Sequence, residues 1–167
     1  MEFITVDKAD RVTTVTLNRP EVMNAINGRM HHELQAAFDD FASDCEQFVC
    51  IVTGAGERAF CAGSDLKAVA ERGEHPVYPA SGYAGLIERF DCDKPIIAAV
   101  NGVAMGGGFE IAMAADMVVA ADHAQFFLPE AGLGILPDNG AVRLPRLLPG
   151  PIAREMLLTG RRMSAEE

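Results

Sequence analysis

Residues 95–110 read Pro-Ile-Ile-Ala-Ala-Val-Asn-Gly-Val-Ala-Met-Gly-Gly-Gly-Phe-Glu, and this stretch decides the fold class. Its first part, 95–100, is apolar with no polar alternation, the pattern of a buried strand in a sheet that is covered on both faces. Three consecutive glycines follow at 106–108, and an apolar helix is predicted from about 108 to 115. A buried strand that passes through a glycine turn into a helix predicts an α/β architecture.

Strands and helices alternate on both sides of this stretch. Apolar residues at helical spacing follow Asn27, a good N-cap, and run to Phe41. Alternating apolar and polar residues near the N-terminus predict a β-hairpin. We predict strands over 3–7, 12–17, 48–53, 117–121 and 125–128, of which the last two are buried. We predict helices over 65–72, 83–91, 139–148 and 150–159, and loops over 55–64 and 73–82.

Length and charge limit the classes of protein to consider. The chain has 167 residues, which predicts one domain, because a domain averages about 150 residues. Fourteen Lys and Arg against 24 Asp and Glu give a net charge of −10. Such an acidic chain repels phosphate backbones and anionic lipids, which argues against nucleic-acid and membrane partners. No signal peptide or membrane span is apparent, so we expect a soluble cytoplasmic protein.

Cysteine and histidine spacing argues against a metal site. The cysteines form no C-x-x-C pair and have no His at ligand spacing. The run His31-His32-Glu33 lacks the second His of a zinc protease motif, so we expect both histidines on the polar face of a helix. The sequence therefore predicts no metal, and buried reduced thiols at Cys45, Cys50, Cys61 and Cys92.

Two glutamates are candidate catalytic residues. Glu110 falls in the first turn of the apolar helix, where burial would raise its pKa and the helix dipole would lower it. The glycines before it let the backbone approach a ligand and leave N–H groups free for an anion. Glu130 follows Pro129 at a strand end, where sites of α/β proteins collect. A structural role for Glu110, and a solvent-facing loop position for Glu130, stay open at this point.

A series of short motifs spans the chain from the N-terminal hairpin to the last residue. The motifs are Leu17-Asn18-Arg19-Pro20, Asn24-Ala25, Ala62-Gly63-Ser64-Asp65-Leu66, Lys94-Pro95, Asn101-Gly102, the glycines 106–108 with Glu110, and Pro129-Glu130 with Leu133-Gly134. In type and order they resemble those of the crotonase superfamily, the enoyl-CoA hydratases and isomerases. The resemblance implies a spiral of repeated ββα units.

The resemblance also bears on the extent of the domain. Family members continue with C-terminal helices, so we expect residues 1–167 to form a single crotonase-like core domain that lacks this helical part. Ser164 and Glu167 have the spacing of a capping box, which announces a further helix. One departure from the family is that Gly140 is followed by Ala141 instead of a second glycine. Nearby, Asp138 adds a third carboxylate where the acyl chain would lie.

The resemblance implies roles for individual residues. The backbone N–H groups of Ser64 and Gly107 would hold the thioester oxygen, which becomes negative in an enolate. Glu130 would exchange the proton at the alpha carbon, and Glu110 would hold or activate the water that adds to the beta carbon. Many family isomerases lack the first glutamate, so the presence of both favours a hydratase or dehydratase, which is a lyase. An isomerase is the alternative among enzymes, and an inactive fragment that only associates with partner subunits is the alternative of another class.

Substrate and assembly follow from the same resemblance. CoA is part of the substrate, so no separate cofactor is implied, and the family forms homotrimers or hexamers when the C-terminal helices are present. The loop 63–67, the segment 83–86 and the run 129–138 look most like the carnitinyl-CoA (crotonobetainyl-CoA) hydratase branch. Arg19 and Lys67 could meet phosphates or be solvated surface residues. The matching substrate-binding positions are Met23, Ala25, Ala62, Asp65, Leu66, Gly106, Pro129, Leu133 and Asp138.

Overall fold

The computed structural model describes residues 1–72 and 77–167, so the predicted loop over 73–82 lies partly outside the described residues. Within them, a five-stranded sheet has the order β1-β2-β3-β5-β7. The hairpin of β1 (Ile4–Ala9) and β2 (Val12–Leu17) is antiparallel, as predicted. The other neighbours are parallel: β2 with β3 (Val49–Gly54), β3 with β5 (Ile96–Val100), and β5 with β7 (Met117–Ala120).

A second, four-stranded sheet has the order β4-β6-β8-β9. It contains β4 (Ala59–Cys61), β6 (Val103–Met105), β8 (Gln125–Phe127) and β9 (Met163–Ser164), and only the β8–β9 pair is antiparallel. Successive units β3-β4-α2, β5-β6-α3 and β7-β8-α4 each add one strand to each sheet and then a helix. This repetition confirms the predicted α/β class and the ββα units.

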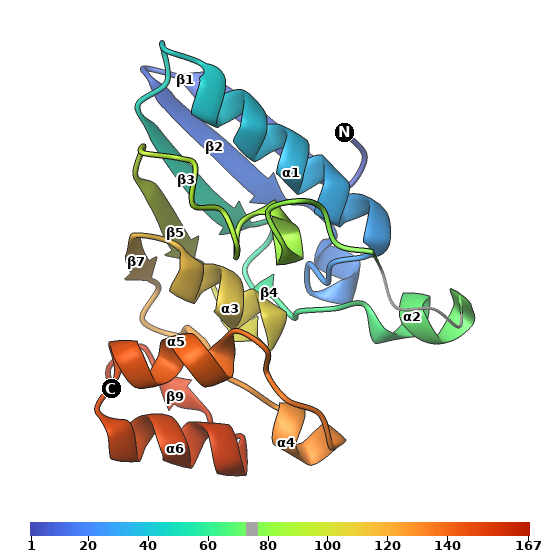
Figure 1. Ribbon diagram of the computed structural model, residues 1–167, viewed down its shortest axis with the longest axis vertical. Coiled ribbons are helices and arrows are strands. Elements are labelled where there is room, and N and C mark those ends of the chain that lie inside the picture. The colour runs from blue at the N-terminus through green and yellow to red at the C-terminus, as the bar shows by residue number, and fades with distance from the viewer. Residues whose placement is uncertain (73–76) are drawn as a thin grey trace.

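Helices cover the sheets and close one end of the molecule. Figure 1 shows the longest helix, α1, lying along the five-stranded sheet, and α5 beside α6 at the end opposite β1. The Asn27 side chain caps α1 by accepting the N–H of Met30 at 2.9 Å, as the sequence predicts. The helices are η1 (Pro20–Val22), α1 (Gly28–Ser43), α2 (Leu66–Arg72), η2 (Tyr83–Gly85), α3 (Gly107–Ala114), α4 (Glu130–Leu133), α5 (Gly140–Leu147) and α6 (Gly150–Thr159).

Several predicted elements are corrected by the structure. The predicted loop over 55–64 contains β4, and the predicted helix over 83–91 is only the single turn η2. The predicted buried strand over 117–121 is the edge strand β7, whose Met117, Val118 and Val119 are exposed. An edge strand has a neighbour on one side only, and the prediction from composition alone could not distinguish it from a central one.

The cysteine and histidine predictions hold only in part. Cys50 and Cys61 are buried, and burial raises the pKa of each thiol to about 12. Cys45, in contrast, is exposed, and Cys92 is half-buried. His31 is fully buried rather than on a polar face. In the described ranges, no three His, Cys, Asp or Glu residues are grouped as a metal would require, and no helix has the length and apolar character needed to cross a bilayer.

The end of the described chain has the predicted capping box. The Ser164 N–H donates to Oε2 of Glu167 at 3.0 Å, and the Glu167 N–H donates to Oγ of Ser164 at 3.3 Å. Ser164 at the same time ends β9, which pairs with β8.

Candidate active site

Glu110 lies in the first turn of α3, directly after the glycine turn that follows β6. Only 6% of its surface is exposed. Its Oε1 accepts two N–H groups at the start of α5, from Asn139 at 2.9 Å and from Gly140 at 2.7 Å. Burial raises the pKa of Glu110, and the charge of Asp138 adds to this, while the two N–H groups and the charge of Arg143 oppose it. The net pKa is raised, so this carboxyl can hold a proton more readily than an exposed one.

Glu130 is the first residue of α4, immediately after β8, and is 9% exposed. Its Oε2 is buried and has no hydrogen-bond partner in the described part of the chain. A Cβ atom on Gly106 would lie 2.9 Å from Oε1 of Glu130, so this carboxyl lies against the glycine turn. Burial raises the pKa of Glu130, and the charges of Glu110 and Asp138 raise it further. The fold therefore brings the two predicted catalytic glutamates within electrostatic reach of each other.

Close neighbours leave no room for a side chain at any of the three glycines of the turn. A Cβ atom on Gly107 would overlap the ring of Tyr83, and one on Gly108 would overlap the carbonyl of Cys61. Gly106 has a φ of 54°, a left-handed conformation that favours glycine, and faces Glu130. A larger residue at any of the three positions would push the backbone away from the groups that surround it.

Two backbone donors are free beside this turn. Ser64 lies opposite Ile26 in an isolated β-bridge, but the hydrogen bonds of this bridge are made by the residues on either side of Ser64. The Gly63 carbonyl accepts the Ile26 N–H, and the Asp65 N–H donates to the Ile26 carbonyl. Within residues 1–72 and 77–167, neither the Ser64 N–H nor the Gly107 N–H donates to a protein acceptor. A Cβ on Gly63 would lie 3.0 Å from the Gly107 nitrogen, so the two segments touch. Two adjacent unpaired donors are what an oxyanion needs.

The other predicted binding residues form two groups. Met23, Ala25, Ala62, Asp65 and Leu66 lie around η1 and the start of α2, where the Ala62 N–H donates to the Met23 carbonyl at 3.0 Å. Gly106 and Pro129 flank Glu130, whereas Leu133 and Asp138 are exposed beyond it. The first group thus lies in or beside the loop whose Gly63 touches Gly107, and the second adjoins or follows Glu130.

Arg19 and Asp65 bind each other rather than facing solvent. The guanidinium of Arg19 donates to Asp65 at 2.9 Å and to the Ala25 carbonyl at 2.6 Å. Asp65 also accepts the Ala68 N–H at 3.1 Å at the start of α2. Both groups hold η1 and α2 together, so the structure favours a positioning role for Arg19 over contact with phosphates.

Three aromatic residues, His31, Tyr78 and Tyr83, are grouped at the glycine turn, and none of them was among the predicted site residues. Tyr83 is buried on Gly107, and its hydroxyl accepts from Oγ of Ser64 at 3.4 Å. The His31 ring lies 4.6 Å from that of Tyr83 and 5.0 Å from that of Tyr78. His31 Nδ1 accepts the Ala84 N–H at 2.9 Å, and burial lowers the pKa of His31 to about 4, so the ring is neutral. The signal available in the sequence was the pair of glycines, 82 and 85, that bracket Tyr83.

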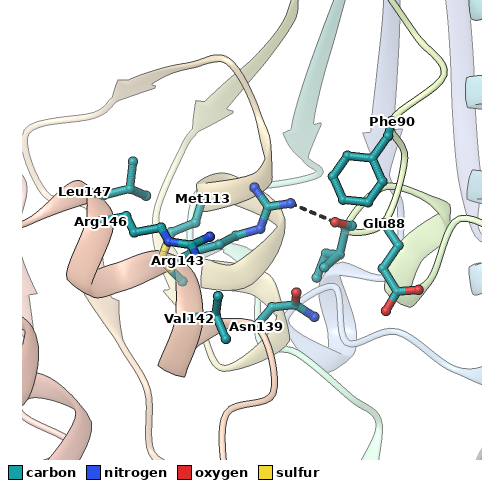
Figure 2. A pocket seen from close by; sticks show the side chains of 9 residues that line it. Glu88, Phe90, Met113, Asn139, Val142, Arg143, Arg146 and Leu147 are labelled. Carbon is teal, nitrogen blue, oxygen red and sulfur yellow. Dashed lines mark hydrogen bonds between the residues drawn. The ribbon is translucent and has the colours of Figure 1, made fainter.

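A pocket of 310 Å³ lies between α5 and the segment that follows η2, with Asn139 in its lining. In it the Arg143 guanidinium points toward the Ile87 carbonyl, to which it donates at 2.7 Å (Figure 2). This bond ties Arg143 of α5 to the segment after η2. From there its positive charge lowers the pKa of Glu110. The lining residues are Ile87, Glu88, Phe90, Met113, Asn139, Val142, Arg143, Arg146 and Leu147.

Comparison with known proteins agrees with this geometry. The model of the enoyl-CoA hydratase/isomerase family matches residues 7–167. Carnitinyl-CoA dehydratases of Proteus mirabilis and Citrobacter koseri are 56% and 57% identical to this chain over 159 residues, which are 93% of this chain and 60% of each relative. The chain thus spans about 60% of the length of these curated relatives.

Solved structures have the same fold. The structure of a carnitinyl-CoA dehydratase from Mycobacterium avium matches with a TM-score of 0.92 and 42% identity, over 98% of this chain and 65% of that one. An enoyl-CoA hydratase from Mycobacterium tuberculosis matches with a TM-score of 0.92 and 40% identity, over 99% of this chain and 65% of that one. The predicted crotonase-like spiral is therefore confirmed over the described residues.

Proposed function

The chain belongs to the enoyl-CoA hydratase/isomerase family, and on this premise we propose that it catalyses the reversible addition of water to a 2-enoyl-CoA thioester. One observation carries the proposal: two buried glutamates with raised pKa values converge on a glycine turn beside two unpaired N–H donors. In this proposal CoA enters as part of the substrate. Glu110 accepts the proton of the water and Glu130 supplies the proton of the alpha carbon, so no separate cofactor is called for.

The two N–H groups act on the thioester oxygen. When a bond forms at the beta carbon, electron density moves through the double bond to that oxygen and produces an enolate. The N–H groups of Ser64 and Gly107 would hold this charge in a site shielded from water, where such donors have their largest effect. Removing one donor of this kind typically slows a reaction by about 10²–10³-fold.

The glutamates divide the proton transfers. Oε1 of Glu110 is occupied by the N–H groups of Asn139 and Gly140, so we assign its Oε2 to the water molecule. Glu110 takes a proton from this water as the hydroxyl bonds to the beta carbon, and Glu130 gives its own proton to the alpha carbon through its unpaired Oε2. The proton gained by Glu110 returns to Glu130 through solvent before the next turnover, and dehydration runs the same steps in reverse.

For the acyl group, we propose crotonobetainyl-CoA, the dehydration product of carnitinyl-CoA. The support is the identity of 56–57% to the carnitinyl-CoA dehydratases described above. The test is a panel of 2-enoyl-CoA thioesters with charged, short and long acyl groups, each followed by the loss of enoyl absorbance. The proposal expects the fastest loss with crotonobetainyl-CoA, and no loss with any thioester would refute it.

The CoA part would lie along the first group of binding residues, around η1 and α2, because these join the loop that carries the Ser64 N–H. We further propose a homotrimer in the cytoplasm. The buried thiols of Cys50 and Cys61 suit a reducing compartment, and the apolar side chains exposed on the edge strand β7 are typical of an interface. Light scattering of the purified chain tests the assembly, and a monomer at micromolar concentration would contradict it.

The charge of Asp138 is expected to shift the pH dependence of the reaction. Hydration requires Glu130 with its proton and Glu110 without one, and the negative charge of Asp138 raises the pKa of both. Asp138→Asn should lower both pKa values, so both limbs of the pH–rate profile should move to lower pH. The measurement is kcat/KM for the neutral substrate crotonyl-CoA against pH, with the exposed Asp7→Asn as control. A profile that stays in place or moves to higher pH would contradict the assignment.

A further inference from the structure

The aromatic residues beside the glycine turn extend from the buried site to its surface. The rings of His31, Tyr78 and Tyr83 meet edge to face, with 5.5 Å between the centroids of Tyr78 and Tyr83. Tyr83 and His31 are buried, whereas Tyr78 is 44% exposed. Tyr83 lies on Gly107, and Tyr78 lies on Tyr83. Only the Tyr83 ring therefore separates the exposed Tyr78 from the Gly107 N–H.

The charges around Tyr78 are negative. Burial raises the pKa of its hydroxyl, and the charges of Asp138 and Glu110 raise it further. Asp138 is exposed and directly precedes Asn139, whose N–H donates to Glu110. The nearby cation, Arg143, is held at the Ile87 carbonyl in the pocket lined by Asn139 (Figure 2). Tyr78 is therefore an exposed aromatic residue within electrostatic reach of an exposed carboxylate, that of Asp138.

This combination suits one kind of acyl group. A quaternary ammonium has no N–H to donate, so proteins bind it through aromatic ring faces and nearby negative charge. An uncharged alkyl chain would gain nothing from Asp138. A cation there would also offset the negative charges of Asp138 and Glu110, both of which act on Tyr78.

We propose that Tyr78 and Asp138 recognise a quaternary ammonium group at the end of the acyl chain and thereby select the substrate. The inference rests on the proposed function and assigns the residues that distinguish a charged acyl group from a neutral one. Tyr78 would supply the ring face, and Asp138 would supply the opposite charge.

Binding of two unreactive thioesters tests this directly. The first is 4-trimethylammoniobutanoyl-CoA, and the second is 5,5-dimethylhexanoyl-CoA, in which carbon replaces the nitrogen and only the charge is lost. Calorimetry of the whole chain should show about tenfold tighter binding of the charged thioester, a typical size for a partly desolvated cation–π contact with a carboxylate nearby. Neither ligand has a double bond, so the result does not depend on turnover.

Variants separate the two contacts. Asp138→Asn and Tyr78→Leu should each lower the ratio of the two affinities to about threefold or less, whereas Tyr78→Phe should keep most of it, because the ring remains. Asp7→Asn, an exposed acid on β1, should leave the ratio unchanged. Thermal melts check that each variant is folded, and Asp138→Asn is a surface change that leaves the packing alone.

The outcomes for the two proposals are distinct. Equal affinities in the unmodified chain, or a ratio that neither Asp138→Asn nor Tyr78→Leu lowers, would overturn the recognition proposal even if the chain hydrates enoyl-CoA. Selective binding of the charged thioester without any hydration would uphold recognition and overturn the proposed reaction. Failure to bind either thioester would overturn both.

Discussion

Glu110→Gln and Glu130→Gln are each expected to slow hydration of a 2-enoyl-CoA by about a thousandfold, within the 10²–10⁴-fold that a positioned acid or base contributes. Gln keeps the shape of Glu, and at position 110 its oxygen can still accept the N–H groups of Asn139 and Gly140. It cannot carry a proton between water and carbon at neutral pH. The measurement is the loss of enoyl absorbance, with the exposed Glu57→Gln as control.

A second readout tells the two glutamates apart. Uptake of deuterium at the alpha carbon in heavy water should depend chiefly on Glu130, because that residue is assigned to the alpha proton. Glu110→Gln should therefore retain much more exchange than Glu130→Gln while both lose hydration. Hydration that persists in Glu110→Gln would refute the two-glutamate mechanism and support an isomerase, in which one glutamate moves a proton within the substrate.

The oxyanion assignment predicts a loss of about 10²–10³-fold when the Gly107 N–H is removed. Gly107→Pro removes that N–H, and proline is tolerated at the first position of a helix such as α3. The Tyr83 ring leaves no room for a side chain at this position, so the substitution is best made in a Tyr83→Ala background. In that background Gly107→Ala is the matched control, because it adds a Cβ but keeps the N–H.

The comparison between the alanine and proline variants isolates the hydrogen bond. Both double variants should melt at similar temperatures, while only the proline variant should show the large loss in kcat. Equal turnover by the two would show that the Gly107 N–H does not hold the thioester oxygen.

Local patterns in the sequence predicted the elements that depend on local interactions. The hairpin of β1 and β2, the capped helix α1 and strand β5 follow from periodicity and N-cap chemistry. The short strands β4 and β6 were missed, because three residues are too few to show alternation. They pair between Ala59 and Val103, which are far apart in the sequence.

Tertiary contacts decided the elements that were predicted wrongly. The segment after residue 82 has apolar residues at helical spacing, yet it forms only one turn, since Gly82, Ala84 and Gly85 all have positive φ. That turn packs on α1, where His31 accepts the Ala84 N–H. A histidine that looked solvated on its own helix is therefore buried by a segment about fifty residues later in the chain.

The sequence predicted which residues form the candidate site, but it did not predict how these residues meet in space. Glu110, Glu130 and the glycine turn were identified from residue type, neighbours and family resemblance. Their meeting depends on β6 and β8 being adjacent parallel strands, so that α3 and α4 begin side by side. Asp138 was predicted at the acyl site from the family resemblance, whereas Tyr78 has no motif of its own, and only the folded chain shows its ring against that of Tyr83.

The most direct test of the hydratase mechanism is isotope labelling with the unmodified chain. A 2-enoyl-CoA is incubated in heavy water that also carries the heavy isotope of oxygen, and the product is analysed by mass spectrometry. The mechanism predicts one deuterium at the alpha carbon and one heavy oxygen at the beta carbon of each product molecule. A rearranged double bond with no heavy oxygen, or a thioester returned without either label, would contradict it.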